Sequence, residues 1–241
     1  MSKKIVLILA EGISEEDALK PALKKIEKRL DIRFRFEGGD VLSDEKNENI
    51  PSKKLIGDIA SKYKKRYYLN PSNILLIAQL TDIDGVFISE DKVIIDSDIK
   101  SSDGKEYALN CIKTRNESKR TEMINRNNRK KKHLNTLSTT HIIMQRPYKI
   151  FYFSRELEHV LHNTISMPDG EKTKKAHEFS TEYDSYEEFK VFFNHDDVVV
   201  AGNYEQTWNY IKDVNHSLER NSNFHLLLEW IEEEVKKLIT N

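Results

Sequence analysis

The sequence predicts an α/β fold in which a mainly parallel sheet is flanked by helices and followed by a helical C-terminal part. An uninterrupted apolar run, 5–10, and a second mainly apolar run, 74–80, are typical of strands covered on both faces, as in a parallel sheet. Between them lie an alternating segment at 32–36, typical of a strand, and segments with helical spacing of apolar residues. Because strands and helices alternate here, right-handed crossovers and a parallel sheet are expected.

The first predicted strand leads into a helix. Ser14, with Asp17 three residues later, is a variant of the capping box that opens helices. Pro21 is expected to kink or restart this helix. A second amphipathic helix is predicted over 50–68, and Asn70, which precedes a proline, marks its end.

Further elements are expected in the rest of the chain. A turn-rich stretch at 86–105 predicts a short hairpin or loop around 93–95, and 148–153 predicts another strand. Helical segments are expected up to 162, then over 172–183, 186–193 and 224–239. A soft boundary near 164–171 divides an α/β domain, 1–163, from a helical region packed on it, 164–241.

Composition narrows the class of protein. Charged residues make up 33% and hydrophobic residues 38% of the chain, so it is expected to fold. The single cysteine, Cys111, excludes an internal disulfide and a cysteine-rich zinc module, and fits a cytoplasmic location. Glu11 ends the first apolar run too early for a signal peptide, and no run reaches the length that spans a membrane. We therefore expect no membrane association.

Carboxylates follow two of the predicted strands. Asp82 and Asp84 stand on a tight turn directly before Gly85, and Glu11 follows the first strand. In parallel sheets, ligands collect where the carboxyl ends of the strands meet, so these side chains are candidate neighbours. Paired carboxylates suit Mg²⁺, and a third can act as general base. The alternative is that the aspartates only form turn hydrogen bonds and that Glu11 lies at a solvated helix start.

These residues resemble the Toprim domain shared by topoisomerases, primases and several small or phage-defence nucleases. The resemblance covers about residues 4–88, within the predicted domain 1–163. It implies a Mg²⁺ or Mn²⁺ site formed by Glu11, Asp82 and Asp84. In this site Asp82 and Asp84 bind the metal, and Glu11 acts as general acid/base or binds a second metal ion. It also implies a nuclease acting on DNA or RNA, a role in phage defence and an ATPase partner encoded elsewhere.

Other features near the motif both support and depart from the Toprim pattern. The acidic helix start at Ser14, Glu15 and Glu16 is similar to that of the nuclease branch. In contrast, Gly85 follows Asp84 directly, and a turn-rich stretch replaces the helix expected after the second aspartate.

Two other interpretations use the same chain. The run around Asp82 also resembles the first motif of haloacid-dehalogenase-type phosphatases, which implies Asp82 as nucleophile and Asp84 as acid/base. Asp196 and Asp197 are the nearest candidates for the acidic pair of that family. The third interpretation is a non-catalytic interaction module, with the aromatic residues around Trp208 in the core or facing a partner. The sequence leaves open whether the chain forms a homo-oligomer.

A basic segment at 113–132 is the candidate contact for nucleic acid. It holds nine basic residues against Glu117 and Glu122, and such clusters neutralise phosphates. The predicted substrate contacts are Lys119, Arg120, Arg126, Arg129 and Lys130. No aromatic residue is interleaved, so contacts to the backbone are expected and base stacking is not. The alternative is a solvated, mobile helix or loop.

A second acidic and histidine-containing segment follows the strand at 148–153. Glu156, His159 and His162 are spaced by three, roughly along one helical face, and the first two are second-tier site candidates together with Glu15. The alternative is an amphipathic helix that buries Leu157 and its apolar neighbours. The chain has no glycine-rich phosphate loop, so ATP hydrolysis by this chain alone is not expected.

Overall fold

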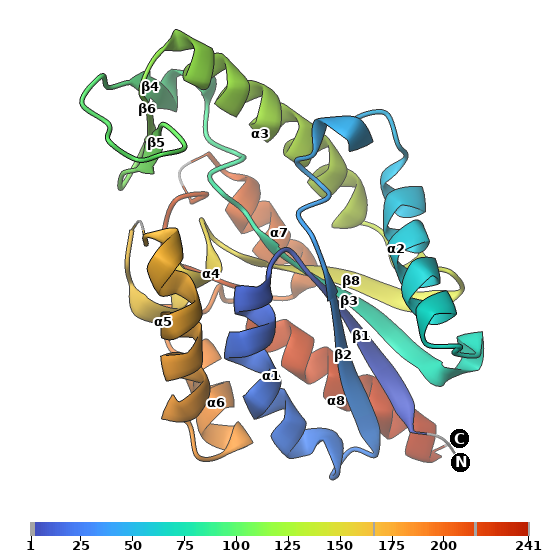
Figure 1. Ribbon diagram of the computed structural model, residues 1–241. Coiled ribbons are helices and arrows are strands. Elements are labelled where there is room, and N and C mark those ends of the chain that lie inside the picture. Colours follow the sequence, from blue (N-terminus) through green and yellow to red (C-terminus); the bar gives the residue numbers. More distant parts are fainter. Residues whose placement is uncertain (1–2, 166, 215, 241) are drawn as a thin grey trace.

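Two apolar strands form the centre of the sheet. The computed structural model describes residues 3–165, 167–214 and 216–240, and within them a five-stranded sheet has the order β2-β1-β3-β8-β7 (Figure 1). The strands are β1 Lys4–Ala10, β2 Ile32–Gly38, β3 Ile74–Asp82, β7 Ile142–Ile143 and β8 Arg146–Phe153. All neighbours pair in parallel except β7, which is antiparallel to β8. The predicted α/β class with a mostly parallel sheet is confirmed.

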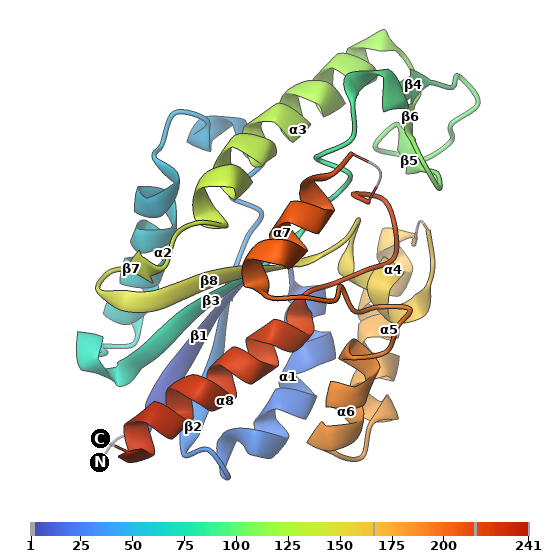
Figure 2. The same ribbon diagram turned by 180° about the vertical axis from the view of Figure 1, so that it is seen from behind.

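Helices cover both faces of this sheet (Figures 1 and 2). They are α1 Ile13–Glu27, α2 Ser52–Arg66, α3 Glu117–Leu137, α4 Leu157–His162, α5 Asp169–Glu182, α6 Tyr186–Phe193, α7 Tyr204–Lys212 and α8 Phe224–Thr240. Single 3₁₀ turns lie at Glu45–Asn47, Pro71–Asn73 and Glu90–Lys92. Among the described residues, no helix combines the length and apolar character needed to cross a bilayer.

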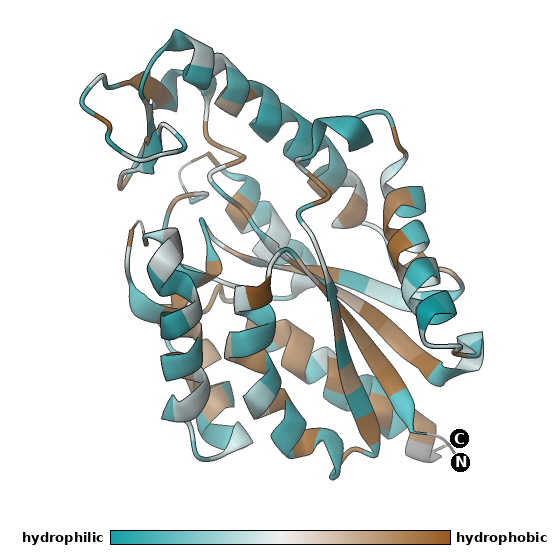
Figure 3. Cartoon of the chain, in the orientation of Figure 1, coloured by the Kyte–Doolittle hydropathy of each residue, from teal (hydrophilic) through white to brown (hydrophobic). Residues whose placement is uncertain are grey.

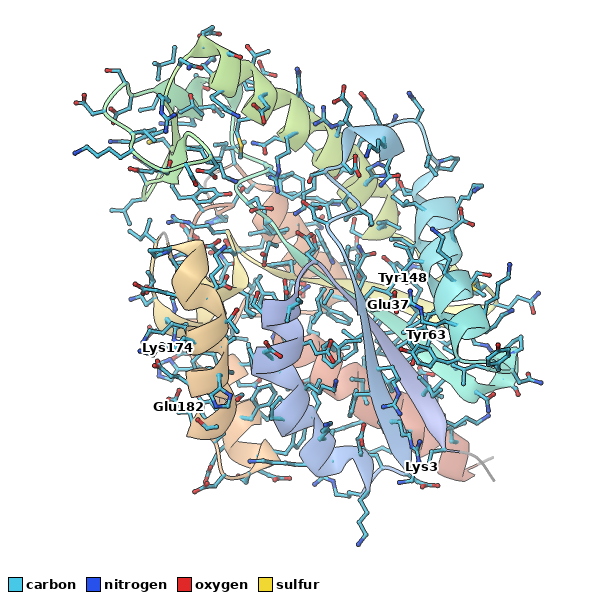
Figure 4. The ribbon with its side chains drawn as sticks, in the orientation of Figure 1. Lys3, Glu37, Tyr63, Tyr148, Lys174 and Glu182 are labelled. Carbon is cyan, nitrogen blue, oxygen red and sulfur yellow. The ribbon has the colours of Figure 1, made fainter. Side chains whose placement is uncertain are left out.

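Each face of the sheet has its own apolar core. Alternate side chains of β1 and β3 enter one core with α1, α4, α5, α6 and α8, and the others enter a second core with α2, α3 and α7. Tyr63 of α2 and Tyr148 of β8 are buried in the second core, and Tyr148 donates a hydrogen bond of 2.6 Å to Gln79 (Figure 4). Residues from both sides of the expected boundary near 164–171 share the first core.

The first helix begins directly after β1. Gly12 is its N-cap residue, and its N–H donates to the Glu15 carboxylate at 2.9 Å, which satisfies one of the free backbone donors of the first turn. Pro21 lies inside α1, which continues to Glu27 without a second start. The apolar face of α1 packs against β2 and α5, so tertiary contacts hold the helix together across the proline.

The turn-rich stretch folds into more structure than the expected hairpin or loop. It contains β4 Val93–Ile95 and β5 Lys105–Tyr107, which join β6 Ile112–Thr114 in a three-stranded sheet of order β4-β6-β5. The strands have three residues each, too short to show a clear alternating pattern in the sequence.

The basic segment forms the end of β6 and most of α3. Asn116 caps α3 by accepting a hydrogen bond of 2.9 Å from the Lys119 N–H. Figure 3 shows α3 as mostly hydrophilic, in contrast to the apolar central strands. An apolar stripe is weak in this helix because part of its inward face is charged: Lys130 is buried together with Met123 and Leu134. The segment is therefore a helix that packs on the body of the protein.

Helix α7 places two aromatic residues near the C-terminus against β8. The sequence patterns do not predict this helix. Trp208 is only 2% exposed, packs against Tyr152 and donates a hydrogen bond of 3.2 Å to the Ile150 carbonyl. The Tyr204 hydroxyl donates to the same carbonyl at 2.9 Å. Both rings therefore contribute to the core against β8.

Trp208→Ala is expected to lower the free energy of unfolding by about 3–5 kcal/mol, because it leaves a large cavity beneath β8. Glu205→Ala, at an exposed position of the same helix, should change it by less than about 0.5 kcal/mol. Urea denaturation of the two variants measures both values. If both variants lowered the free energy of unfolding equally, the packing of Trp208 against β8 would not stabilise the protein.

Candidate active site

The ends of β1 and β3 lie side by side. The two strands pair in parallel with Leu9 opposite Gln79, which brings Glu11 beside Thr81. The Thr81 hydroxyl donates a hydrogen bond to the Glu11 carboxylate. The predicted adjacency of the two strand ends is confirmed, and the carboxylates that follow them share one edge of the sheet.

Lys130 of α3 joins two of these carboxylates. Its ammonium lies 2.9 Å from Glu11 and 2.7 Å from Asp84, and its side chain is 0% exposed. Burial alone would lower the pKa of Lys130, but Asp84 and Glu11 outweigh it and raise the pKa above its ordinary value. Lys130 therefore stays charged and links α3 to the ends of both central strands.

The turn at Asp84 is held by main-chain and side-chain contacts. The Asp84 N–H donates to the Arg155 carbonyl at 2.7 Å, and its carboxylate accepts from Arg126 at 2.8 Å and from the Tyr107 hydroxyl at 3.0 Å. Burial would raise the pKa of Asp84, but Arg126 and Lys130 hold it well below its usual range. Asp84 is therefore ionised at neutral pH.

Gly85 is required at the next position of this turn. Its φ of 68° lies in the left-handed region, which favours glycine. A Cβ atom there would lie 2.7 Å from the Leu218 side chain and 3.0 Å from the Ile112 side chain. The close approach packs the turn against the three-stranded sheet and explains why a glycine follows Asp84 directly.

Asp82 and Glu15 lie in the same acidic environment. Asp82 accepts a hydrogen bond of 3.0 Å from the Leu157 N–H at the start of α4, which orients its carboxylate. Burial, followed by repulsion from Glu15 and Glu11, raises the pKa of Asp82 well above its ordinary value. Burial also raises the pKa of Glu15, with Glu158 adding repulsion. Negative charge is in excess around Asp82.

The carboxylates open into a cavity of about 750 Å³. One wall comes from the loop after β4 and from β5, including Lys105 and Tyr107. The opposite wall contains Glu156, Pro168 and Lys172. Its floor and remaining sides include Glu11, Asp82, Asp84 and Arg126. The predicted site residues therefore face a space large enough for a substrate.

The five basic residues predicted as substrate contacts occupy different environments. Lys130 is buried against Glu11 and Asp84, and Arg126 lies at the cavity while paired with Asp84. Arg120 and Arg129 donate to the main-chain carbonyls of Val93 and Ser43. Lys119 pairs with Glu122 at the surface. Of the five, Arg126 and Lys119 are the side chains placed to meet a ligand, because both line hollows at this edge.

The second-tier candidates Glu156 and His159 lie in different environments. Glu156 is the N-cap residue of α4, faces the cavity and pairs with Lys172 at 3.0 Å. His159 is buried in α4, where burial and then Arg155 lower its pKa to about 4, and it does not line the cavity. Asp196 and Asp197 are exposed after α6 and do not line the cavity either.

Several site residues carry no signal in the sequence. Tyr107 and Lys105 stand on the short strand β5, and Asp40 reaches Arg126 at 3.6 Å from the loop after β2. Each is an ordinary residue in a turn-rich stretch, with no motif around it. Only the packing of the three-stranded sheet and α3 brings them to the strand ends.

The donor chemistry of the site suits a hard divalent cation. Among the described residues, no group of three or more His, Cys, Asp and Glu side chains is arranged to hold a metal ion. The Lys130 ammonium pairs with both Glu11 and Asp84 and offsets one of their two negative charges. However, carboxylate oxygens are the ligands that Mg²⁺ prefers, and burial, with repulsion from neighbouring carboxylates as a smaller cause, raises the pKa of Glu11 and Asp82.

No protein-family model, curated protein or solved structure matches this chain. The likeness to Toprim domains therefore remains a resemblance that depends on Glu11, Asp82 and Asp84. Their convergence at one cavity is independent of that resemblance, because it follows from the pairing of β1 and β3 and from the contacts of Lys130.

Lys130→Met is expected to lower the free energy of unfolding by about 3–5 kcal/mol, because it leaves Glu11 and Asp84 buried without their shared cation. Lys132→Met, at an exposed position of the same helix, is the matched control and should cost less than about 1 kcal/mol. Chemical denaturation of both variants provides the comparison. A small effect for Lys130→Met would mean that the ion pairs contribute little to stability.

Stability is expected to fall as pH rises from about 4.5 to about 7, because burial chiefly raises the pKa of Glu11 to about 7. In this window the folded protein holds a proton that the unfolded chain has lost, so a higher pH favours unfolding. The raised pKa of Asp82 also makes the folded protein less stable as pH rises. Glu11→Gln should flatten the dependence in urea titrations across this range, and an unchanged slope would contradict the assignment.

Proposed function

We propose that this protein is a divalent-cation-dependent enzyme that hydrolyses phosphodiester bonds in nucleic acid. The observation that carries the proposal is the convergence of Glu11, Asp82 and Asp84 at one cavity, with Arg126 and Lys105 on its walls. Carboxylates for a metal and cations for a phosphate thus face the same space.

The protein's own residues have distinct roles in this proposal. Asp82 and Asp84 are the metal ligands, since the Leu157 N–H orients the Asp82 carboxylate and side-chain donors orient that of Asp84. Bound Mg²⁺ or Mn²⁺ would supply Lewis-acid polarisation of a phosphoryl oxygen. Glu11, with a pKa of about 7, can accept and return a proton at neutral pH. Arg126 offers a charged donor to a phosphate oxygen at the cavity wall.

The other two interpretations gain no support from the geometry. A phosphatase of the haloacid-dehalogenase type needs an acidic pair beside Asp82, but the candidates Asp196 and Asp197 are exposed after α6 and do not line the cavity. An interaction module built on the C-terminal aromatics needs them exposed, but Trp208 is buried. A role in phage defence, an ATPase partner and a cytoplasmic location remain predictions from the sequence.

Purified protein is expected to cleave DNA or RNA oligonucleotides in Mg²⁺ or Mn²⁺ and to be inactive in EDTA. Glu11→Gln should lower the rate at least about 100-fold, the range for loss of acid/base catalysis. Asp82→Asn should also lower the rate, because it removes a metal ligand. Glu16→Gln is the control, because Glu16 pairs with Lys20 on the surface of α1 and does not line the cavity. Gel assays of end-labelled oligonucleotides measure these rates.

A generic phosphomonoester distinguishes the alternatives. Under the phosphatase interpretation, Asp82→Asn abolishes its hydrolysis while Glu11→Gln leaves it nearly unchanged. If the wild-type protein cleaves neither nucleic acid nor a phosphomonoester, the hydrolase proposal is wrong for the isolated chain.

A further inference from the structure

The cavity at the carboxylates continues into a second hollow along α3. The second hollow measures about 250 Å³ and shares Asp103, Lys105 and Arg126 with the larger one. It extends the space to Lys119 and Met123 on α3. The two hollows together form one groove, which we call the α3–α5 groove. It runs from Pro168 and Lys172 past the carboxylates to Lys119.

Cations lie on both sides of the carboxylates in this groove. Lys172 belongs to α5, whose helix packs in one core of the sheet, and Arg126 and Lys119 belong to α3, which packs in the other. The carboxylates lie at the edge between them. A phosphate monoester would need cations on one side only, whereas a chain of phosphates that extends in both directions meets a cation before and after the scissile bond.

Two cations of the groove, Lys119 and Lys105, can exchange their present partners for phosphate. Lys119 pairs with Glu122 at the surface, and Lys105 lies 3.9 Å from Asp103. Exposed pairs of this kind contribute little, so a phosphate can compete with the carboxylate. The Lys119 stem packs on Gly104, 3.3 Å from the position of a Cβ atom there, which holds Lys119 at the wall of the groove.

We infer that the substrate is a single-stranded polynucleotide bound along the α3–α5 groove, an inference that rests on the proposed function. The side chains of Glu11 and Asp84 are only 12% and 11% exposed, so a phosphate must enter the groove to reach them. A duplex is stiff, with a persistence length of about 50 nm, so bending it into such a walled site costs free energy. A single strand can follow it.

The aromatic side chain in this groove is not placed for base stacking. Tyr107 is the aromatic side chain that lines its larger part, but its hydroxyl donates to Asp84 and its ring lies against Lys105 and Arg155. That ring is not free to stack on a base, which is the usual contact to single strands. The contacts that we infer are therefore made to the sugar-phosphate backbone.

Fluorescence anisotropy of the full chain with labelled oligo(dT), oligo(U) and a blunt duplex, each of about 20 units, tests the inference. Ca²⁺ replaces Mg²⁺ in this assay, because it takes the same oxygen ligands. We expect the single strands to bind at least about tenfold more tightly than the duplex at low salt. Comparison of the two single strands shows whether DNA or RNA is preferred.

Lys119→Glu and Lys105→Glu should each weaken single-strand binding about tenfold through the lost phosphate contact. Lys132→Glu makes the same charge change on an exposed part of α3 that does not line the groove, and should alter binding less than about twofold. Lys119→Gln, which keeps most of the stem that packs on Gly104, separates lost charge from lost packing.

Equal affinity for duplex and single strands, or equal effects of Lys132→Glu and Lys119→Glu, would overturn the inference. The cleavage assay is independent of this result. Cleavage of duplex as fast as single strands would contradict the groove assignment and leave the proposed hydrolase intact. Selective single-strand binding without any metal-dependent cleavage would support the groove and refute the hydrolase.

Discussion

The buried ammonium of Lys130 is the interaction on which the arrangement of this protein depends. It connects a long polar helix to the ends of both central strands through Glu11 and Asp84. Without it, two buried carboxylates would face each other with only Arg126 nearby, and α3 would lose its charged anchor. The position of α3 in turn supports the three-stranded sheet and one end of the α3–α5 groove. Stability and site geometry are therefore linked through one side chain.

The same edge of the sheet buries several carboxylates close together. Glu11, Glu15 and Asp82 all have a raised pKa, whereas Asp84, the carboxylate that both Arg126 and Lys130 contact, has a lowered one. A fold selected only for stability would not bury these groups together, because each costs free energy of desolvation. Groups with opposite shifts beside one cavity are the expected pattern of a site that handles protons and charge.

The turn after β3 shows how local sequence and tertiary packing combine. The pattern of two aspartates before a glycine indicates a turn, and the left-handed φ at Asp84 and Gly85 agrees with it. Alone, that pattern fits a metal site and a plain structural turn equally well. The turn contacts Arg155, Arg126 and Leu218 on different sides. These contacts fix the direction of the Asp84 carboxylate.

The sequence by itself determined the central strands, because each is a run of mainly apolar residues. The alternation of strands and helices then predicted that these strands are parallel, which brings Glu11 to the same edge of the sheet as the aspartates. Only the tertiary structure decided that α3 covers the site, that Trp208 is buried and that Lys105 and Tyr107 line the cavity. Lys130 and Glu11 are 119 positions apart, and a lysine looks the same in sequence whether water or a carboxylate surrounds it. Burial and pairing, which give that charge its role, exist only in the folded chain.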